Sequence, residues 1–147
     1  LPICKNTDGI AAVMGHEVAH AFAKHGQERM TSAYGQQLGG IAVALGTSGQ
    51  EAETQVLWNT IYGVGSQVGM LAYSRTHETE ADKLGMVFMI MAGYNPEEAI
   101  QVWVRMSELS KGSAPPEFLS THPSNETRVK NLQAYMPTAI ELAKKYN

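Results

Sequence analysis

The stretch His16-Glu17-Val18-Ala19-His20 lies inside a segment with the apolar spacing of an α-helix, which predicts that this part of the fold is helical. We expect this helix to start after Thr7-Asp8 and to end near His25-Gly26, where the glycine can terminate it. Two histidines four residues apart lie about 40° apart around a helix axis, so their rings can converge on one metal ion. The apolar positions of this predicted helix are Ile10, Val13, Met14, Val18, Ala21 and Phe22.

Glu17 lies on a flank of the same helical face as the two histidines. A carboxylate there can take a proton from a water activated by the metal and deliver it to a leaving amine. The alternative is that the five-residue pattern arose by chance and that the histidines are solvated or capped. We favour a zinc site, because we expect Val13, Met14 and Val18 to bury this helix, and two buried histidines without a metal or partners would be costly.

A catalytic zinc site needs a third protein ligand and an open position for water. His25 is about half a turn away from His16, so it points to the wrong side. Glu78 and Asp82 are four residues apart, which lets Glu78 bind the metal while Asp82 orients a ligating histidine. We therefore predict Glu78 as the third ligand. The candidates weighed against it are Glu80, Asp82, His25, His77, which we expect to be exposed, and His122.

The rest of the sequence is typical of a mainly α protein. We expect separate helices over about Gln50–Ala72 and Ser74–Met91, because glycines interrupt the first of them, and a last short helix opened by Pro137. Only Leu1–Cys4 could form the end of a strand, a small β element at the N-terminal edge. The glycines from Gly35 to Gly69 either mark a membrane-facing or mobile hairpin or let helices approach closely, and we favour close approach.

Composition sets limits on domain number and partners. The 147 residues, with 44% hydrophobic and 17% charged residues, suit a single domain over residues 1–147. The net charge of −3, without a basic run, excludes a nucleic-acid binder, and the single Cys4 excludes an intramolecular disulfide. Because the sequence opens at Leu1 without a signal peptide, we expect a fragment or processed product of a longer chain, so that any membrane association would come through parts outside it.

Three motifs in order resemble the HtpX-like and CAAX-prenyl-protease-like metallopeptidases over about Ala11 to Arg128. They are Gly15-His16-Glu17-Val18-Ala19-His20, Ser74-Arg75-Thr76-His77-Glu78-Thr79-Glu80-Ala81-Asp82, and Thr121-His122-Pro123-Ser124 with Arg128. The resemblance implies a zincin-like (minigluzincin) helical domain that binds one zinc ion through His16, His20 and Glu78. It implies Glu17 as general base, Asp82 as support for a ligand, and His122 as a catalytic residue at the substrate carbonyl or the oxyanion.

The resemblance is closest to soluble or lipid-anchored periplasmic members, which implies the bacterial periplasm or envelope, with the cytoplasm as the alternative. The leading hypothesis is a zinc-dependent endopeptidase acting on polypeptides in envelope protein quality control. The alternative is a metal-binding chaperone or assembly module with a latent or structural zinc site. The fourth ligand discriminates between them: water favours an enzyme, and a side chain such as His122 favours a latent site.

Overall fold

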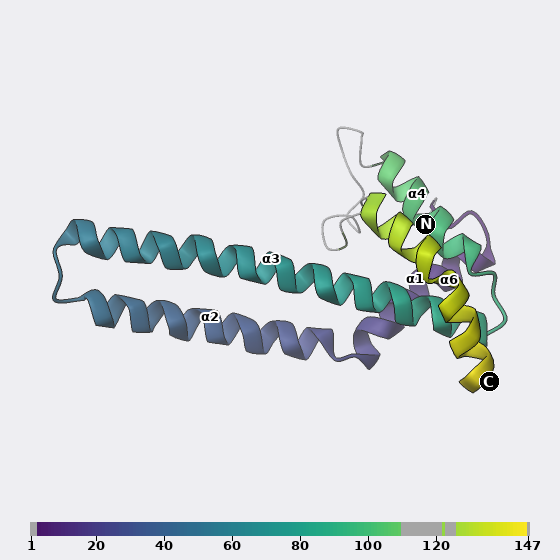
Figure 1. The fold of residues 1–147 in the computed structure, drawn as a ribbon, viewed down its shortest axis with the longest axis horizontal. Helices are drawn as coiled ribbons and strands as arrows, with labels where there is room; N and C mark the ends of the chain where they lie inside the picture. Colours follow the sequence, from purple (N-terminus) through teal and green to yellow (C-terminus); the bar gives the residue numbers. More distant parts are fainter. Residues whose placement is uncertain (1–2, 110–121, 123–125, 147) are drawn as a thin grey trace. The chain divides into compact units, whose positions relative to one another are not determined.

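The structure, a computed structural model, describes residues 3–109, 122 and 126–146. Those residues form helices and turns without a strand, as the mainly α prediction requires, and Ile3 and Cys4 are buried in a turn rather than a β element. No described helix combines the length and the apolar character needed to cross a membrane. The helices are α1 (Thr7–Phe22), α2 (His25–Thr47), α3 (Ala52–Met91), α4 (Glu97–Leu109) and α6 (Glu126–Tyr146), shown in Figure 1.

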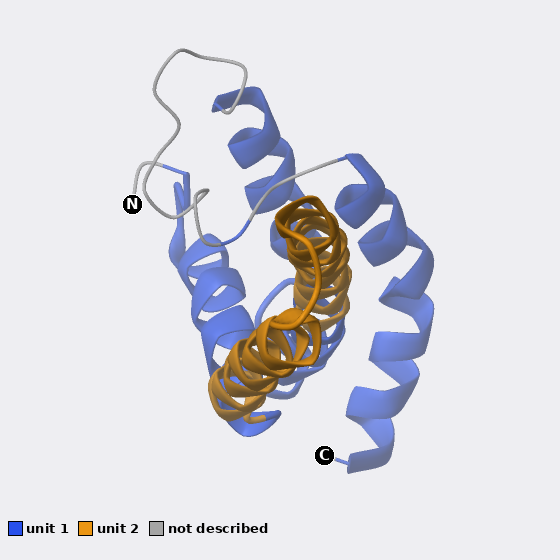
Figure 2. Ribbon diagram, turned by 90° about the vertical axis from the view of Figure 1, so that its left-hand side faces the viewer, with its two compact units in different colours: residues 1–23, 78–147 blue, residues 24–77 orange. Residues whose placement is uncertain are grey.

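The chain divides into two compact units (Figure 2). The core unit consists of residues 1–23 and 78–147, and the hairpin unit of residues 24–77. Helix α3 contributes to both, with Ala52–His77 in the hairpin unit and Glu78–Met91 in the core unit. Every predicted site residue therefore belongs to the core unit, whereas the rejected candidates His25 and His77 belong to the hairpin unit.

Both ends of α1 are fixed by local backbone chemistry. The side chain of Asn6 accepts a hydrogen bond from the backbone N–H of Gly9 at 2.7 Å, which caps the first turn. At the other end α1 stops at Phe22, and Lys24 takes a left-handed conformation with φ of 58°. The prediction that Gly26 ends this helix is wrong, because His25 and Gly26 already form the first turn of α2.

Two further predicted helix boundaries are wrong. Helix α3 is continuous from Ala52 to Met91, since interior glycines cost helix stability without breaking the backbone hydrogen bonds. Pro137 lies inside α6 and does not open a helix of its own. A proline removes one helical hydrogen bond. Leu132 and Ala139, on either side of it, are both buried, so packing holds the two halves of α6 on the core.

The core of the core unit is built from methionines and aliphatic side chains. Helix α4 packs against both α1 and α6, and Trp103 of α4 is buried between them. Methionine fills irregular gaps between helices well, which suits the buried Met86 and Met89. The largest fully buried side chains are Met86, Met89, Met106, Leu132 and Val102.

Helix α1 turns its small residues, not its large ones, toward this core. The expectation of burial is wrong for Met14 and Val18, because both side chains are at least half exposed, whereas Val13 is partly buried and packs against the core. The face that is buried carries His16 among small residues, namely Gly9, Ala12, Gly15 and Ala19. This small face lets the backbone of α1 come close to its neighbour.

The closest approach is between Gly15 of α1 and Gly85 of α3. A Cβ atom at Gly15 would lie 2.9 Å from the carbonyl oxygen of Gly85, and one at Gly85 would lie 2.8 Å from the backbone nitrogen of His16. These contacts are backbone to backbone, so no side-chain rotation relieves them. The two glycines therefore set the distance between the helix that carries His16 and the helix that carries Glu78.

We predict that Gly85→Ala lowers the free energy of unfolding by about 1–3 kcal/mol, because the added methyl group must push α1 away from α3. Urea unfolding followed by circular dichroism measures the change. The control is Gly35→Ala, also in mid-helix but with nothing within 4 Å of the added Cβ, which should be neutral or stabilising by up to about 1 kcal/mol. Equal stability of the two variants would contradict the close crossing.

Candidate metal centre

Four side chains of the core unit gather into one cluster. His16 and His20 come from α1, Glu78 from α3, and His122 from the segment before α6. One nitrogen or oxygen atom from each lies within 4.8 Å of all the others. The structure thus brings together the three predicted ligands and adds His122 to them. The neighbours of His122 in its motif, Thr121, Pro123 and Ser124, lie outside the described residues.

The spacing of these atoms fits a small cation that binds four ligands in a tetrahedral arrangement. Nε2 of His16 lies 3.1 Å from Nε2 of His20 and 3.4 Å from Oε2 of Glu78, and His20 Nε2 lies 3.3 Å from Glu78 Oε1. Nδ1 of His122 is 3.3 Å from His16 Nε2 and 3.0 Å from Oε2 of Glu78. Four tetrahedral ligands at the zinc–nitrogen distance of about 2.0–2.1 Å lie about 3.3 Å apart. The nitrogen and oxygen donors are also those that zinc accepts.

The electrostatics of the cluster keep Glu78 ionised. Burial opposes the charged form, but contacts with His122, His16, His20 and the Arg128 guanidinium outweigh it and hold the pKa of Glu78 below its usual range. Burial also opposes protonation of His16. The carboxylates of Asp82 and Glu78 overcome that effect and raise the His16 pKa. The cluster therefore stabilises a positive charge next to the Glu78 carboxylate.

Asp82 and Arg128 support the cluster from behind. Oδ1 of Asp82 lies 3.1 Å from Nδ1 of His16, the ring nitrogen that faces away from Glu78, although the pair is not aligned as a hydrogen bond. Arg128 donates from Nε to Oδ2 of Asp82 at 2.8 Å and from Nη2 to Oδ1 at 2.7 Å. Its Nη1 lies 3.0 Å from Oε2 of Glu78. Asp82 therefore lies where it can orient the His16 ring, the role predicted for it.

Trp103 completes this support, which the sequence did not reveal. The Arg128 guanidinium lies 3.6 Å from the centre of the Trp103 ring, and the His16 ring packs edge-on against the same indole. Nothing in the sequence neighbourhood of Trp103 indicates these contacts. Its position follows from the packing of α4 against α1 and α6.

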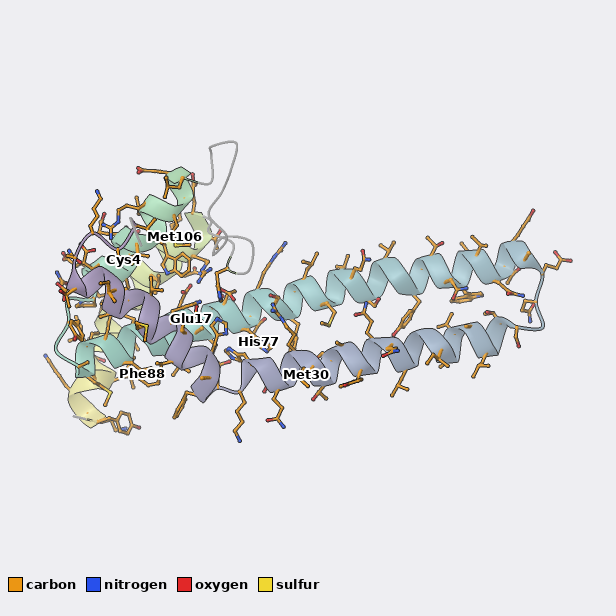
Figure 3. The ribbon with its side chains drawn as sticks, turned by 180° about the vertical axis from the view of Figure 1, so that it is seen from behind. Cys4, Glu17, Met30, His77, Phe88 and Met106 are labelled. Carbon is orange, nitrogen blue, oxygen red and sulfur yellow. The ribbon has the colours of Figure 1, made fainter. Side chains whose placement is uncertain are left out.

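Glu17 lies beside the cluster and remains half exposed (labelled in Figure 3). Its Oε1 is 3.3 Å from Nε2 of His122. His122 thus places one ring nitrogen among the candidate ligands and the other next to the predicted general base. A carboxylate that is accessible and close to the cluster can exchange protons with a water or substrate there.

His25 and His77 are not part of the cluster and pair with each other inside the hairpin unit. Their rings stack with centres 4.2 Å apart and planes 9° apart, and Nε2 of His77 lies 3.0 Å from Oε2 of Glu28. This geometry agrees with the prediction that His25 is not a metal ligand. The expectation that His77 is exposed is wrong, because its partners His25 and Glu28 cover it and the side chain is buried.

The sequence matches peptidase family M48 over residues 1–136, which is most of the chain. The chain belongs to peptidase family M48. Family members are metallopeptidases, and this agrees with the resemblance drawn from the three motifs.

Named relatives come from both mitochondria and bacteria. The mitochondrial metalloendopeptidase OMA1 of Saccharomyces cerevisiae is 37% identical over 147 residues, which cover 97% of this chain and 40% of the relative. The OMA1 protein of Schizosaccharomyces pombe is 37% identical over 145 residues, with 95% of this chain and 40% of the relative covered. The β-barrel assembly-enhancing protease of Escherichia coli is 27% identical over 130 residues, covering 84% of this chain and 26% of the relative.

The chain therefore spans about 40% of the length of the two yeast relatives. No solved structure gave a significant match to it. The expectation of a bacterial periplasmic protein fits only the bacterial relatives, because the yeast relatives are named as mitochondrial.

We predict that Asp82→Asn weakens zinc binding about 10–100-fold, because the neutral amide no longer holds the His16 ring and leaves Arg128 partly unpaired. Competition against a chelator of known affinity measures the change. The control is Glu80→Gln, which removes an exposed acid two residues away on the same helix and should leave zinc affinity unchanged. Similar affinities for both variants would remove Asp82 from the site.

Proposed function

We propose that this chain, residues 1–147, is the peptidase domain of a zinc-dependent endopeptidase in which His16, His20 and Glu78 hold the metal. The observation that carries the proposal is the set of three ligand atoms spaced 3.1–3.4 Å apart beside an accessible glutamate. A zinc ion held there supplies a Lewis acid that polarises a carbonyl and lowers the pKa of water to about 7. Membership in family M48 supports a polypeptide as the substrate.

The chain's own residues divide the remaining work. Glu17 is half exposed, so its carboxylate can accept a proton from the attacking water and return it to the leaving amine. The imidazole of His122, which is 3.3 Å from Glu17 through Nε2, can donate a hydrogen bond to the carbonyl oxygen as negative charge develops on it. Asp82 and Arg128 keep the His16 ring and the Glu78 carboxylate in place, so that neither has to reorganise during the reaction.

A second candidate function rests on the place of His122 in the cluster. Its Nδ1 is as close to His16 and Glu78 as those ligands are to each other, so it can fill the fourth position. A site filled in this way would be latent or structural, and the domain would act as a metal-binding chaperone or assembly module. One relative is named as an assembly-enhancing protease, so peptidase and assembly roles occur together in that name.

We place the protein in a mitochondrion or a bacterial envelope, where it would act in protein quality control. The higher identity to the mitochondrial relatives, 37% against 27% for the Escherichia coli protease, favours the mitochondrion over the bacterial periplasm. Fractionation of the source cells tests this, and a purely cytoplasmic location would contradict it.

Replacing the general base gives the most direct test of the proposed function. We expect Glu17→Gln to lower the rate of peptide cleavage by about 10²–10⁴-fold, because the amide cannot accept the proton. Zinc content should stay stoichiometric, since Glu17 is not among the predicted ligands. The assay is cleavage of a quenched-peptide library by zinc-loaded protein, with chelated protein as the blank. Cleavage that survives the substitution would refute the mechanism.

His122→Ala separates the two candidate functions. If His122 stabilises the developing oxyanion, kcat falls by about 10²-fold while zinc stays bound through the other three side chains, and this is the outcome we expect. The zinc stoichiometry and kcat are measured on the same preparation. An increase in kcat would instead show that His122 blocks the site, and would favour the latent alternative.

A further inference from the structure

Trp103 has two neighbours that belong to the metal cluster or its support. The guanidinium carbon of Arg128 lies 3.6 Å from the centre of the indole ring, and the His16 ring packs edge-on against the indole with ring centres 5.3 Å apart. All three side chains are buried. Trp103 therefore contacts one candidate ligand directly and is linked to a second, Glu78, through Arg128.

Each nitrogen of the Arg128 guanidinium faces a carboxylate oxygen. Nε and Nη2 donate to the two oxygens of Asp82 at 2.8 and 2.7 Å, and Nη1 lies 3.0 Å from Oε2 of Glu78. Because the guanidinium is planar, its donors point outward within the plane, and its two faces carry none. An aromatic ring can therefore cover one face and fix the plane without displacing either carboxylate.

The two oxygens of Glu78 have different surroundings. Oε1 lies 3.3 Å from Nε2 of His20 and 3.0 Å from Nδ1 of His122. Oε2 lies 3.4 Å from Nε2 of His16 and also faces the Arg128 cation. A ring nitrogen that binds a metal cannot donate a hydrogen bond, whereas arginine remains a donor under all conditions. When His16 and His20 hold a metal, the contact that persists on Glu78 is the one between Oε2 and Arg128.

From this asymmetry we propose that Trp103 is a positioning residue, which holds Arg128 against Oε2 so that Glu78 binds the metal through Oε1 alone. The proposal rests on the proposed function, since it takes Glu78 as a metal ligand. A carboxylate can bind a metal through one oxygen or through both. A catalytic zinc with three protein ligands keeps a fourth position for water, and a second oxygen of Glu78 would compete for that position. Trp103 and Arg128 thus keep it open.

The indole is needed because an arginine side chain has many rotamers. Ordering such a side chain costs conformational entropy, and a guanidinium without a fixed plane can turn until it no longer meets both carboxylates. A cation is attracted to the face of an aromatic ring, and most strongly where water is excluded. The buried indole therefore favours the one rotamer of Arg128 that reaches Asp82 and Glu78 together.

The alternative is that Trp103 only fills the core between α1, α4 and α6. Any smaller residue would then disturb the site through the cavity that it leaves, whether aromatic or aliphatic. The positioning role predicts a difference between two smaller residues, because phenylalanine offers a π face to Arg128 and leucine does not. The comparison of Trp103→Phe with Trp103→Leu therefore separates the two roles.

The test is the visible absorption spectrum of the chain loaded with Co²⁺ in place of zinc. Four-coordinate Co²⁺ absorbs more strongly than Co²⁺ with five or six ligands, so the intensity reports the coordination number. We expect an intense band from the parent chain, a band closer to the parent's from Trp103→Phe, and a clear loss of intensity in Trp103→Leu, where Glu78 contributes its second oxygen. With zinc, Trp103→Leu should lower kcat about 10–100-fold.

A second variant and a matched control accompany these two. Arg128→Lys keeps the positive charge but loses the planar fork, so it should lose cobalt band intensity as Trp103→Leu does. Val102→Ala, on the same helix, shortens a side chain that is 2% exposed against 5% for Trp103, and should leave the cobalt spectrum like the parent's. Circular dichroism establishes that each variant is folded, and the parent spectrum tests the proposal without any substitution.

Three results would overturn the proposal. The first is a weak cobalt band from the parent chain itself, which would mean that more than four ligands already surround the metal. The second is an equal loss of intensity in Trp103→Phe and Trp103→Leu, and the third is the same loss in Val102→Ala. Failure of the proposed function looks different, because the parent chain would then bind neither metal stoichiometrically, or would bind it with an intense cobalt band and cleave no peptide.

Discussion

Two glycines, Gly15 on α1 and Gly85 on α3, let two helix backbones meet where any side chain would hold them apart. This contact decides the geometry of the cluster, because His16 follows Gly15 directly and Glu78 and Asp82 precede Gly85 by seven and three residues. A helix separation larger by one methyl group would move the imidazoles of α1 away from the carboxylates of α3. Because the helices cross this closely, the His16–His20 pair on α1 and the Glu78–Asp82 pair on α3 lie next to each other and form one site. The two residues of each pair are four positions apart.

The second constraint is that the close packing of α1 and α3 buries charged side chains. Glu78, Asp82 and Arg128 are all buried, and each would be costly inside the core unit on its own. They are tolerated because Arg128 bonds both carboxylates and lies over the Trp103 ring. Such a network holds the two carboxylates in one arrangement, and a pre-arranged carboxylate suits both metal binding and catalysis. Stability and chemistry therefore depend on the same few side chains.

The sequence predicted those parts of the site that lie within a single helix. His16 with His20, and Glu78 with Asp82, are recognisable because a four-residue interval places both side chains on one face. The contacts of Trp103 and Arg128 were missed because they depend on how α4 and α6 pack, which no local spacing encodes. The burial of His77 was missed for the same reason, since its partners His25 and Glu28 lie about fifty residues away. The catalytic roles predicted for the site residues stay predictions.

Helix boundaries failed where local preference competed with packing. Pro137 disfavours helix, yet α6 continues through it because Leu132 and Ala139 on either side are buried in the core. Glycines lower helix stability, yet α3 continues through them because a glycine keeps its backbone hydrogen bonds. The outward direction of Met14 and Val18 shows the same limit, since an apolar stripe indicates that a helix has two faces but not which face is buried. On α1 the small residues, not the large ones, mark the buried side.

The stacking of His25 on His77 has a consequence for how the chain can vary. The rings join the first residue of α2 to the last residue of the hairpin unit, so the two ends of the hairpin lie close together. When the two ends of an inserted segment are adjacent, a longer segment costs little additional closure entropy. The cost is roughly 0.6 kcal/mol for each doubling of the segment's length. Turns of helix can therefore be added to or removed from both arms in evolution while the residues on either side of the hairpin keep their register.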